Sequence, residues 1–185
     1  MSDEIERIHH DPPTALIPEK VGVGLFATEV VVFHSENEVA IDFIQGIAKP
    51  YRVVRRVIIT EKVAKTLNDT LKTELQTNKS KNSSYVENLK NKNTQEIENI
   101  SSQESTDFQK KEKVDDIYSG LKMENNELNG FYANKILVNY GKVSFCLDFI
   151  SNIYPKSIVT SRIFMTKNSV LELLNALNKI FNNDQ

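Results

Sequence analysis

The chain has little of several features that mark common protein classes. It contains one cysteine in 185 residues, which excludes an intramolecular disulfide and a zinc site built from cysteines alone. No apolar run approaches the roughly 20 residues of a membrane span, and the acidic first residues do not resemble a secretory signal. The 23 Lys and Arg residues nearly balance the 25 Asp and Glu residues, which argues against a strongly basic nucleic-acid coat or a polyacidic tail. These absences predict a soluble, cytoplasmic protein.

An internal repeat is the main feature that the sequence does have. Residues 24–32 align with residues 130–138, Ile41-Asp-Phe-Ile aligns with Leu147-Asp-Phe-Ile, and Arg56-Val-Ile-Ile-Thr aligns with Arg162-Ile-Phe-Met-Thr. The two members of every pair are 106 residues apart, and the alignment needs no gap. Such a constant spacing across strands, turns and a helix indicates a tandem duplication.

Each copy carries the signals of three strands and a helix. In the first copy, apolar and β-branched residues predict strands over 26–34, 39–44 and 53–59, and leucines at helical spacing follow. Thr60 and Thr166 are placed to cap the two helices. A copy of about 50 residues lies near the lower limit for a self-sufficient core. We therefore expect an α+β fold, in which two copies of a three-stranded antiparallel meander followed by a helix pack as a pseudo-twofold pair.

The domain organisation follows from the composition. The segment between the copies is rich in Asn, Lys, Ser, Gln and Glu, and it has too few large apolar residues to offset its ordering entropy. We expect disorder over 78–106 and a weaker helical tendency over 107–123. The predicted organisation is a flexible arm at 1–19, a first repeat at 20–75, a polar and mostly disordered linker at 76–129, and a second repeat at 130–185.

Two repeated pairs are the first candidate site residues. Asp42 and Arg56 recur as Asp148 and Arg162, and each pair falls on one predicted sheet face. The favoured interpretation is a cross-strand ion pair that fixes the register. The alternative is a site in which the paired arginines bind an anion or a partner's carboxylate.

A basic cluster in the first copy is the second candidate. Lys49, Arg52, Arg55 and Arg56 could contact phosphate or another anion. The alternative is that these basic side chains have no binding role and lie at a solvent-exposed strand edge. The second copy has Ile158 at the Arg52 position and Ser161 at the Arg55 position, so any such patch is confined to the first copy.

The sequence offers no catalytic, metal or cofactor constellation. His9 and His10 have no partner at helical spacing, and His34 has no counterpart in the second copy. Cys146 replaces Ala40 and has no histidine near it in the sequence, so we expect a small sheet residue rather than a nucleophile. Gly22-Val-Gly-Leu lacks the remaining residues of a phosphate-binding loop.

The repeated motifs resemble one family. Gly130-Phe-Tyr-Ala-Asn, Leu147-Asp-Phe, Ser161-Arg-Ile-Phe-Met-Thr and Leu173-Leu-Asn-Ala-Leu are similar to the bacterial domain-of-unknown-function family numbered 3467. The resemblance covers residues 130–181 well and residues 24–75 less well, because the first copy departs at Phe26-Ala-Thr, Ile41 and Arg55. It implies no activity and no catalytic residues.

These observations favour a non-enzymatic protein that acts through protein–protein interaction or self-association. One alternative is a nucleic-acid-binding regulator that uses the basic strand of the first copy, and its affinity would fall steeply with salt. Another is a small-ligand sensor, for which a deep polar pocket at the junction of the copies would be the sign. We expect the two repeats to pair within the chain, no cofactor and no membrane.

Overall fold

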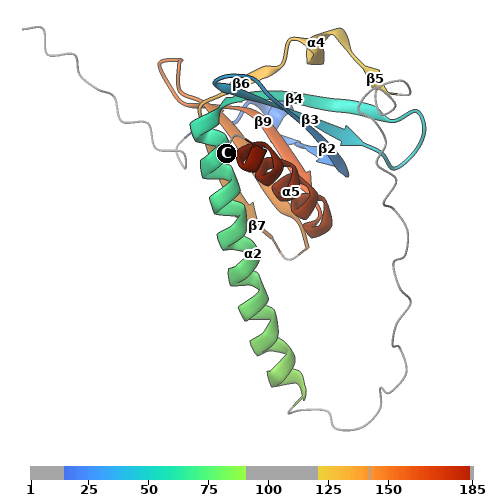
Figure 1. Cartoon of the computed structure of the whole chain (residues 1–185), viewed down its shortest axis with the longest axis vertical. Helices are drawn as coiled ribbons and strands as arrows, with labels where there is room; N and C mark the ends of the chain where they lie inside the picture. Colours follow the sequence, from blue (N-terminus) through green and yellow to red (C-terminus); the bar gives the residue numbers. More distant parts are fainter. Residues whose placement is uncertain (1–14, 91–120, 142, 184–185) are drawn as a thin grey trace, which may run out of the picture.

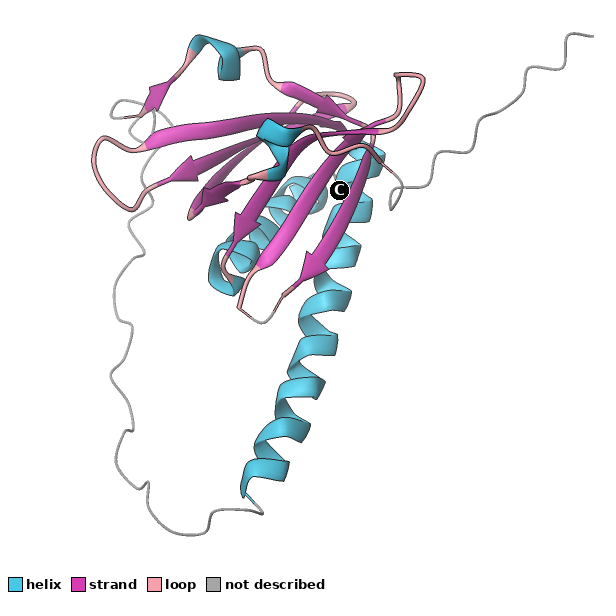
Figure 2. Ribbon diagram, turned by 180° about the vertical axis from the view of Figure 1, so that it is seen from behind, coloured by secondary structure: helices cyan, strands magenta, loops and turns pink. Residues whose placement is uncertain are grey.

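The computed structural model describes residues 15–90, 121–141 and 143–183. They form an α+β fold in which strands from both repeats lie together, and the long helices α2 (Glu61–Lys90) and α5 (Lys167–Asn183) lie on one side of the strands (Figure 1). From behind, the strands lie in front of both helices (Figure 2). The expected α+β class is confirmed.

The two repeats have the same order of strands. Each contains an antiparallel meander, β2-β3-β4 in the first repeat and β7-β8-β9 in the second, which confirms the predicted meanders. The strands are β1 (Leu25–Ala27), β2 (Glu29–His34), β3 (Glu38–Gln45) and β4 (Arg52–Thr60), then β6 (Phe131–Ala133), β7 (Lys135–Tyr140), β8 (Phe145–Ser151) and β9 (Ile158–Met165).

Both long helices begin at a threonine cap. The Thr60 hydroxyl accepts a hydrogen bond from the backbone N–H of Val63 at 3.4 Å, and the Thr166 hydroxyl accepts one from Ser169 at 3.2 Å. These bonds satisfy N–H groups that the first helical turn leaves free. The helices then bury the leucines of their apolar stripes, Leu67, Leu71, Leu173 and Leu177.

The single strand expected over 26–34 is wrong, because it breaks at Thr28. The Thr28 hydroxyl accepts a hydrogen bond from the backbone N–H of Gly46 at 2.8 Å. Asn134 occupies the equivalent place between β6 and β7, and its side chain accepts the N–H of Asn152 at 3.1 Å. A short polar side chain that bonds to a neighbouring backbone competes with ladder pairing, so the strand changes direction there.

Because of this break, the short strands β1 and β6 pair with strands of the other repeat. β1 pairs in parallel with β9 of the second repeat, and β6 pairs in parallel with β4 of the first. The strands therefore form two sheets, β1-β9-β8-β7 and β2-β3-β4 with β5 and β6 beside β4, and each sheet contains strands from both repeats. The helices are exchanged as well, since α5 packs on β2 and α2 packs on β7.

Two glycines make the exchange possible. Gly24 and Gly130 immediately precede β1 and β6, and both have positive φ, at 71° and 70°. A Cβ on Gly24 would collide with the Phe164 ring on β9, and a Cβ on Gly130 would lie 2.8 Å from Ile58 on β4. Only glycine combines this backbone conformation with so close an approach to the neighbouring strand.

The core is shared between the repeats. Phe43 on β3 and Phe149 on β8 are equivalent residues, and their rings lie 5.6 Å apart with no exposed surface. Contact between equivalent residues is what a twofold relation places on its axis. Each of these phenylalanines lies at a register shift of its strand, which lets the following isoleucine, Ile44 or Ile150, be buried too.

Several expected boundaries are wrong. α2 continues to Lys90, beyond the limit of 75 set for the first repeat and into the segment expected to be disordered from residue 78. No proline or glycine interrupts residues 61–90, and each added residue contributes one helical hydrogen bond. Residues 91–120, which contain most of the expected linker and helical tendency, lie outside the described residues, as does the arm over 1–14.

The repeat also extends further toward the N-terminus than expected. Leu16 lies in the expected arm, yet it pairs in parallel with Ile158, and α1 (Glu19–Gly22) follows. At the same spacing, β5 (Lys122–Met123) pairs in parallel with Arg52 and Val53, and α4 (Asn125–Leu128) follows. In the described residues 121–129, these short elements replace the linker expected up to residue 129 and the end of the helical tendency expected over 107–123. Their backbones repeat although their side chains differ.

We predict that residues 121–185 do not fold as a monomer when they are separated from the first repeat. β6 would lose its partner β4, and α5 would lose the β2 surface that it covers. The fragment should either dimerise, with two copies supplying these surfaces to each other, or remain unfolded. Sedimentation with circular dichroism would measure this, with the full chain as control, and a folded monomeric fragment would contradict the exchanged arrangement.

Candidate functional site

The repeated Asp–Arg residues form two equivalent ion pairs. Arg56 donates from Nε and from one terminal nitrogen to the two oxygens of Asp42, at 2.6 and 2.7 Å. Arg162 donates to Asp148 in the same way, at 2.7 and 2.8 Å. The members of each pair are direct cross-strand partners. The two-bond geometry is the strong form of an arginine–carboxylate contact.

The carboxylates of both ion pairs are buried, which is typical of ion pairs that stabilise the arrangement of strands. Asp42 is fully buried and Asp148 is 3% exposed, whereas the arginines reach the surface. Hydrogen bonding to Asp148 raises the pKa of Arg162 further above its ordinary value. In each arginine, Nε and one terminal nitrogen are already bound to the aspartate. Neither arginine can therefore use this pair of nitrogens to bind an external anion.

The basic cluster does not act as one patch. Arg56 is bound to Asp42, and Arg55 forms a 3.4 Å ion pair with Glu127 while its guanidinium lies 4.1 Å from the centre of the Phe131 ring. Lys49 is exposed in the loop between β3 and β4, and Arg52 is exposed at the start of β4. Two of the four predicted anion contacts therefore already have carboxylate partners.

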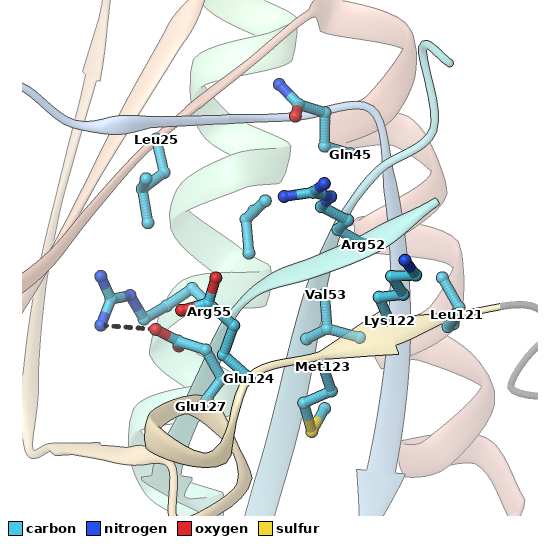
Figure 3. A pocket seen from close by; sticks show the side chains of 11 residues that line it. Leu25, Gln45, Arg52, Val53, Arg55, Leu121, Lys122, Met123, Glu124 and Glu127 are labelled. Atoms are coloured by element: carbon cyan, nitrogen blue, oxygen red, sulfur yellow. Dashed lines mark ion pairs between the residues drawn. The ribbon is translucent and has the colours of Figure 1, made fainter. Parts of the chain in front are cut away.

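A pocket of about 670 Å³ lies beside this cluster. Its walls come from β1, the end of β3, the first half of β4, and the segment of β5 and α4 that leads into the second repeat. Figure 3 shows Gln45, Arg52 and Lys122 along one side of the pocket and Arg55, Glu124 and Glu127 along the other. The apolar part of the lining is Leu25, Val53, Val54, Leu121 and Met123.

The side of the pocket formed by Arg55 and Glu127 is poorly hydrated. Their side chains are only 17% and 14% exposed, and Arg55 Nε and Glu127 Oε2 are buried without a hydrogen-bond partner among the described residues. Burial raises the pKa of the Glu127 carboxyl, Arg55 acts in the opposite direction, and Glu124 adds to the rise.

The two repeats differ in chemistry at the pocket. Arg55, Glu127 and Phe131 form an ion pair stacked on an aromatic ring, whereas the equivalent residues of the other repeat are Ser161, Val21 and Leu25. Gln45 is exposed, but its equivalent Ser151 is buried, and Ser161 is buried as well. The equivalent place in the second repeat therefore has small and apolar side chains in place of the charged ones.

The sequence pointed to Arg52 and Arg55 but not to the opposite wall of the pocket. That wall comes from residues 121–127, which lie in the segment expected to be a linker. The signal that would have found it is the repeat spacing, because Leu16 and Lys122 precede the repeated glycines by the same distance.

The remaining reactive side chains form no site among the described residues. Burial raises the pKa of the Cys146 thiol to about 11, with Asp148 adding to the rise, so the thiolate is scarce at neutral pH. His34 is exposed at the end of β2, and His9 and His10 lie outside the described residues. Within the described ranges, no three His, Cys, Asp or Glu side chains are grouped to hold a metal ion.

None of the described helices is long and apolar enough to cross a membrane.

The fold and this pocket define a class of α+β protein in which two repeats exchange strands and helices. The family model described as Protein of unknown function (DUF3467) matches residues 1–85. This match supports the family resemblance for the first repeat, where the sequence analysis had judged it weaker, and it does not cover the second. Searches of curated proteins and of solved structures give no match.

We predict that Arg162→Ala lowers the free energy of unfolding by about 1–3 kcal/mol, because it leaves the buried Asp148 carboxylate without its partner. Arg52→Ala, at an exposed position, is the control and should change it by no more than about 0.5 kcal/mol. Chemical denaturation would measure both variants. Equal effects would show that the ion pair does not stabilise the fold.

We predict a pH-dependent difference between the wild type and Glu127→Gln. The pKa of Glu127 is raised above 4.5 in the folded protein, so the folded state binds the proton more tightly than the unfolded state does. The wild-type free energy of unfolding should therefore fall, relative to the variant, as the pH rises from below 4.5 through the raised folded value. Urea denaturation across this pH range would test it. Taking the difference between the two proteins removes the similar contribution of Glu172, whose pKa burial also raises.

Proposed function

We propose that this chain is a non-enzymatic, cytoplasmic binding protein, and that the pocket between β4 and the β5–α4 segment is its ligand site. The observation that carries the proposal is that none of the charged residues around this pocket has a charged equivalent in the other repeat. Side chains that serve the fold recur in both repeats, as the two Asp–Arg pairs, the two threonine caps and the two glycines do. The polar residues of the pocket do not recur.

The size and lining of the pocket support a small ligand. A volume of about 670 Å³ lies within the range of roughly 300–1,000 Å³ that is usual for ligand sites. Its lining combines six polar or charged residues with five apolar ones, so it can contact both polar and apolar parts of a ligand. The pocket lies where the two repeats meet, which is the position that the sequence analysis associated with a ligand sensor.

The charged residues give less support to the other hypotheses. A nucleic-acid site needs several free cations, and Arg55 and Arg56 are each paired with a carboxylate. An enzyme needs a base poised near neutral pH, which a carboxylate bound by an arginine does not supply. The single cysteine is consistent with a reducing compartment.

Self-association has one specific observation in its favour. Ile47 and Ile153 lie at equivalent positions in the loops after β3 and β8, and they are 67% and 66% exposed. Two such side chains on one molecule could join copies of the chain. This second candidate does not involve the pocket, so sedimentation of Ile47→Ser/Ile153→Ser beside the wild type would test it separately.

We also infer that the second repeat is a further copy of the unit that the family model matches in the first. Its strands and caps occur at the same spacing as those of the first repeat, and its glycine has nearly the same φ. The sequence motifs at residues 130–181 support the same inference.

We predict that small molecules bind at the pocket and perturb Met123 selectively. The chain has three methionines, of which Met123 lines the pocket and Met165 is fully buried on β9. Protein labelled at the methionine methyl groups would be screened by NMR against a collection of neutral, cationic and anionic fragments. Binding should shift the Met123 signal while Met165 stays in place.

The matched variant takes its residues from the second repeat. Arg52→Ile, Arg55→Ser, Lys122→Leu and Glu127→Val together install the side chains that the chain already packs at the equivalent positions. This variant should fold and lose the fragment-induced shifts. If no fragment moves Met123, or if the variant binds as well as the wild type, the pocket is not the ligand site.

A further inference from the structure

One row of residues on neighbouring strands beside the pocket places two positive charges next to each other, which does not stabilise the sheet. Gln45 on β3, Arg52 on β4 and Lys122 on β5 are neighbours in register, so two cations stand directly opposite each other on adjacent strands. Like charges in this position destabilise a sheet. Neither cation has a carboxylate partner among the described residues, and both are exposed at the pocket.

The equivalent row that ends in the second repeat contains no cation. Its members are Ser151, Ile158 and Leu16, paired in the same register. The backbone therefore accepts an apolar pair where the first repeat has Arg52 and Lys122. Both positions are cations in this row and apolar in the equivalent one, and an anion held between Arg52 and Lys122 would offset the repulsion of the two cations.

The charges around the pocket limit which anion fits. The lining has three cationic side chains, Arg52, Arg55 and Lys122, and two carboxylates, Glu124 and Glu127. Since Arg55 is paired with Glu127, the free positive charge is concentrated at Arg52 and Lys122. One excess positive charge complements a monoanion, and the nearby carboxylates oppose a phosphate dianion or a polyanion.

The apolar wall beside this row indicates the rest of the ligand. Val53 and Met123 directly follow Arg52 and Lys122 on the paired strands and therefore point to the opposite face of the sheet, so the apolar surface on the side of the cations comes from the other lining residues, Leu25, Val54 and Leu121. An acyl or aromatic body of a few carbons would gain free energy by leaving water against these side chains. The Gln45 amide adds a neutral donor near the two cations.

We propose that the pocket binds a small organic monocarboxylate, with its carboxylate between Arg52 and Lys122 and its apolar part against Leu25 and Leu121. This proposal rests on the proposed function, because it names the ligand class of the same pocket. The site performs recognition only, and the ligand leaves unchanged.

The test uses linear carboxylates of increasing length, acetate, butanoate and hexanoate, titrated into the full chain labelled at the methionine methyl groups. Hexanoate should shift Met123 without shifting Met165, with an affinity that rises with chain length and falls with added salt. Hexanamide is the neutral control, because it has the same carbon chain as hexanoate without the negative charge. Inorganic phosphate and a single-stranded oligonucleotide are the anionic controls, because they carry negative charge without the alkyl chain.

The decisive variant is Arg52→Ile/Lys122→Leu, which should weaken hexanoate binding by about tenfold or more through loss of charge-assisted hydrogen bonds. Without ligand it should melt no lower than the wild type, because it removes a like-charge pair. Lys62→Leu/Lys156→Leu removes the same charge from exposed positions outside the pocket lining and should leave binding unchanged.

The outcomes separate the two proposals. If hexanamide binds as tightly as hexanoate, or if the Arg52/Lys122 variant binds hexanoate normally, the carboxylate assignment fails while the pocket remains a ligand site. Tighter binding of phosphate or of the oligonucleotide at Met123 would also overturn the monocarboxylate. If no carboxylate moves Met123 but other fragments do, the ligand class is wrong. If nothing moves it, both proposals fail.

Discussion

The exchange of β1 and β6 between the repeats is the constraint on which the rest of the structure depends. Each of these three-residue strands completes the sheet of the other repeat, so neither sheet is complete within its own half of the sequence. The exchange needs a left-handed residue before the strand, supplied by Gly24 and Gly130, and a change of direction after it, at Thr28 and Asn134. Helix packing follows from it, because α2 and α5 cover the strands that the exchange brings to them.

The buried ion pairs have a different role from the core around them. A buried Asp42 or Asp148 costs desolvation free energy that a pair of apolar residues would not, so the pairs are a weak source of net stability. Their contribution is to the register: a slip of one residue would move Asp42 into the apolar core and leave Arg56 without a partner. They therefore discriminate against wrong pairings of two sheets whose apolar patterns are nearly the same.

The sequence predicted those parts of the molecule that depend on local pattern. Alternating apolar residues predicted β3 and β4, the caps at Thr60 and Thr166 marked the helix starts, and the repeat spacing related the two halves. The break at Thr28 was missed because residues 26–34 read as one continuous β-branched run, and only the neighbouring loop supplies the hydrogen bond that interrupts it. The pocket was missed for a related reason: residues 121–127 carry no apolar pattern, and they are ordered by pairing with Arg52 and Val53.

A fused pair of repeats can carry a site that a symmetric dimer would have to carry twice. In a dimer of identical chains, the Arg52–Lys122 row would occur on both sides and its repulsion would be doubled. In this chain one half has Leu16, Ile158 and Ser161, and the other half has Lys122, Arg52 and Arg55 at the equivalent positions. The same backbone pairing therefore forms with and without charge in this row, and a duplication within one chain lets the pair of cations occur once rather than twice.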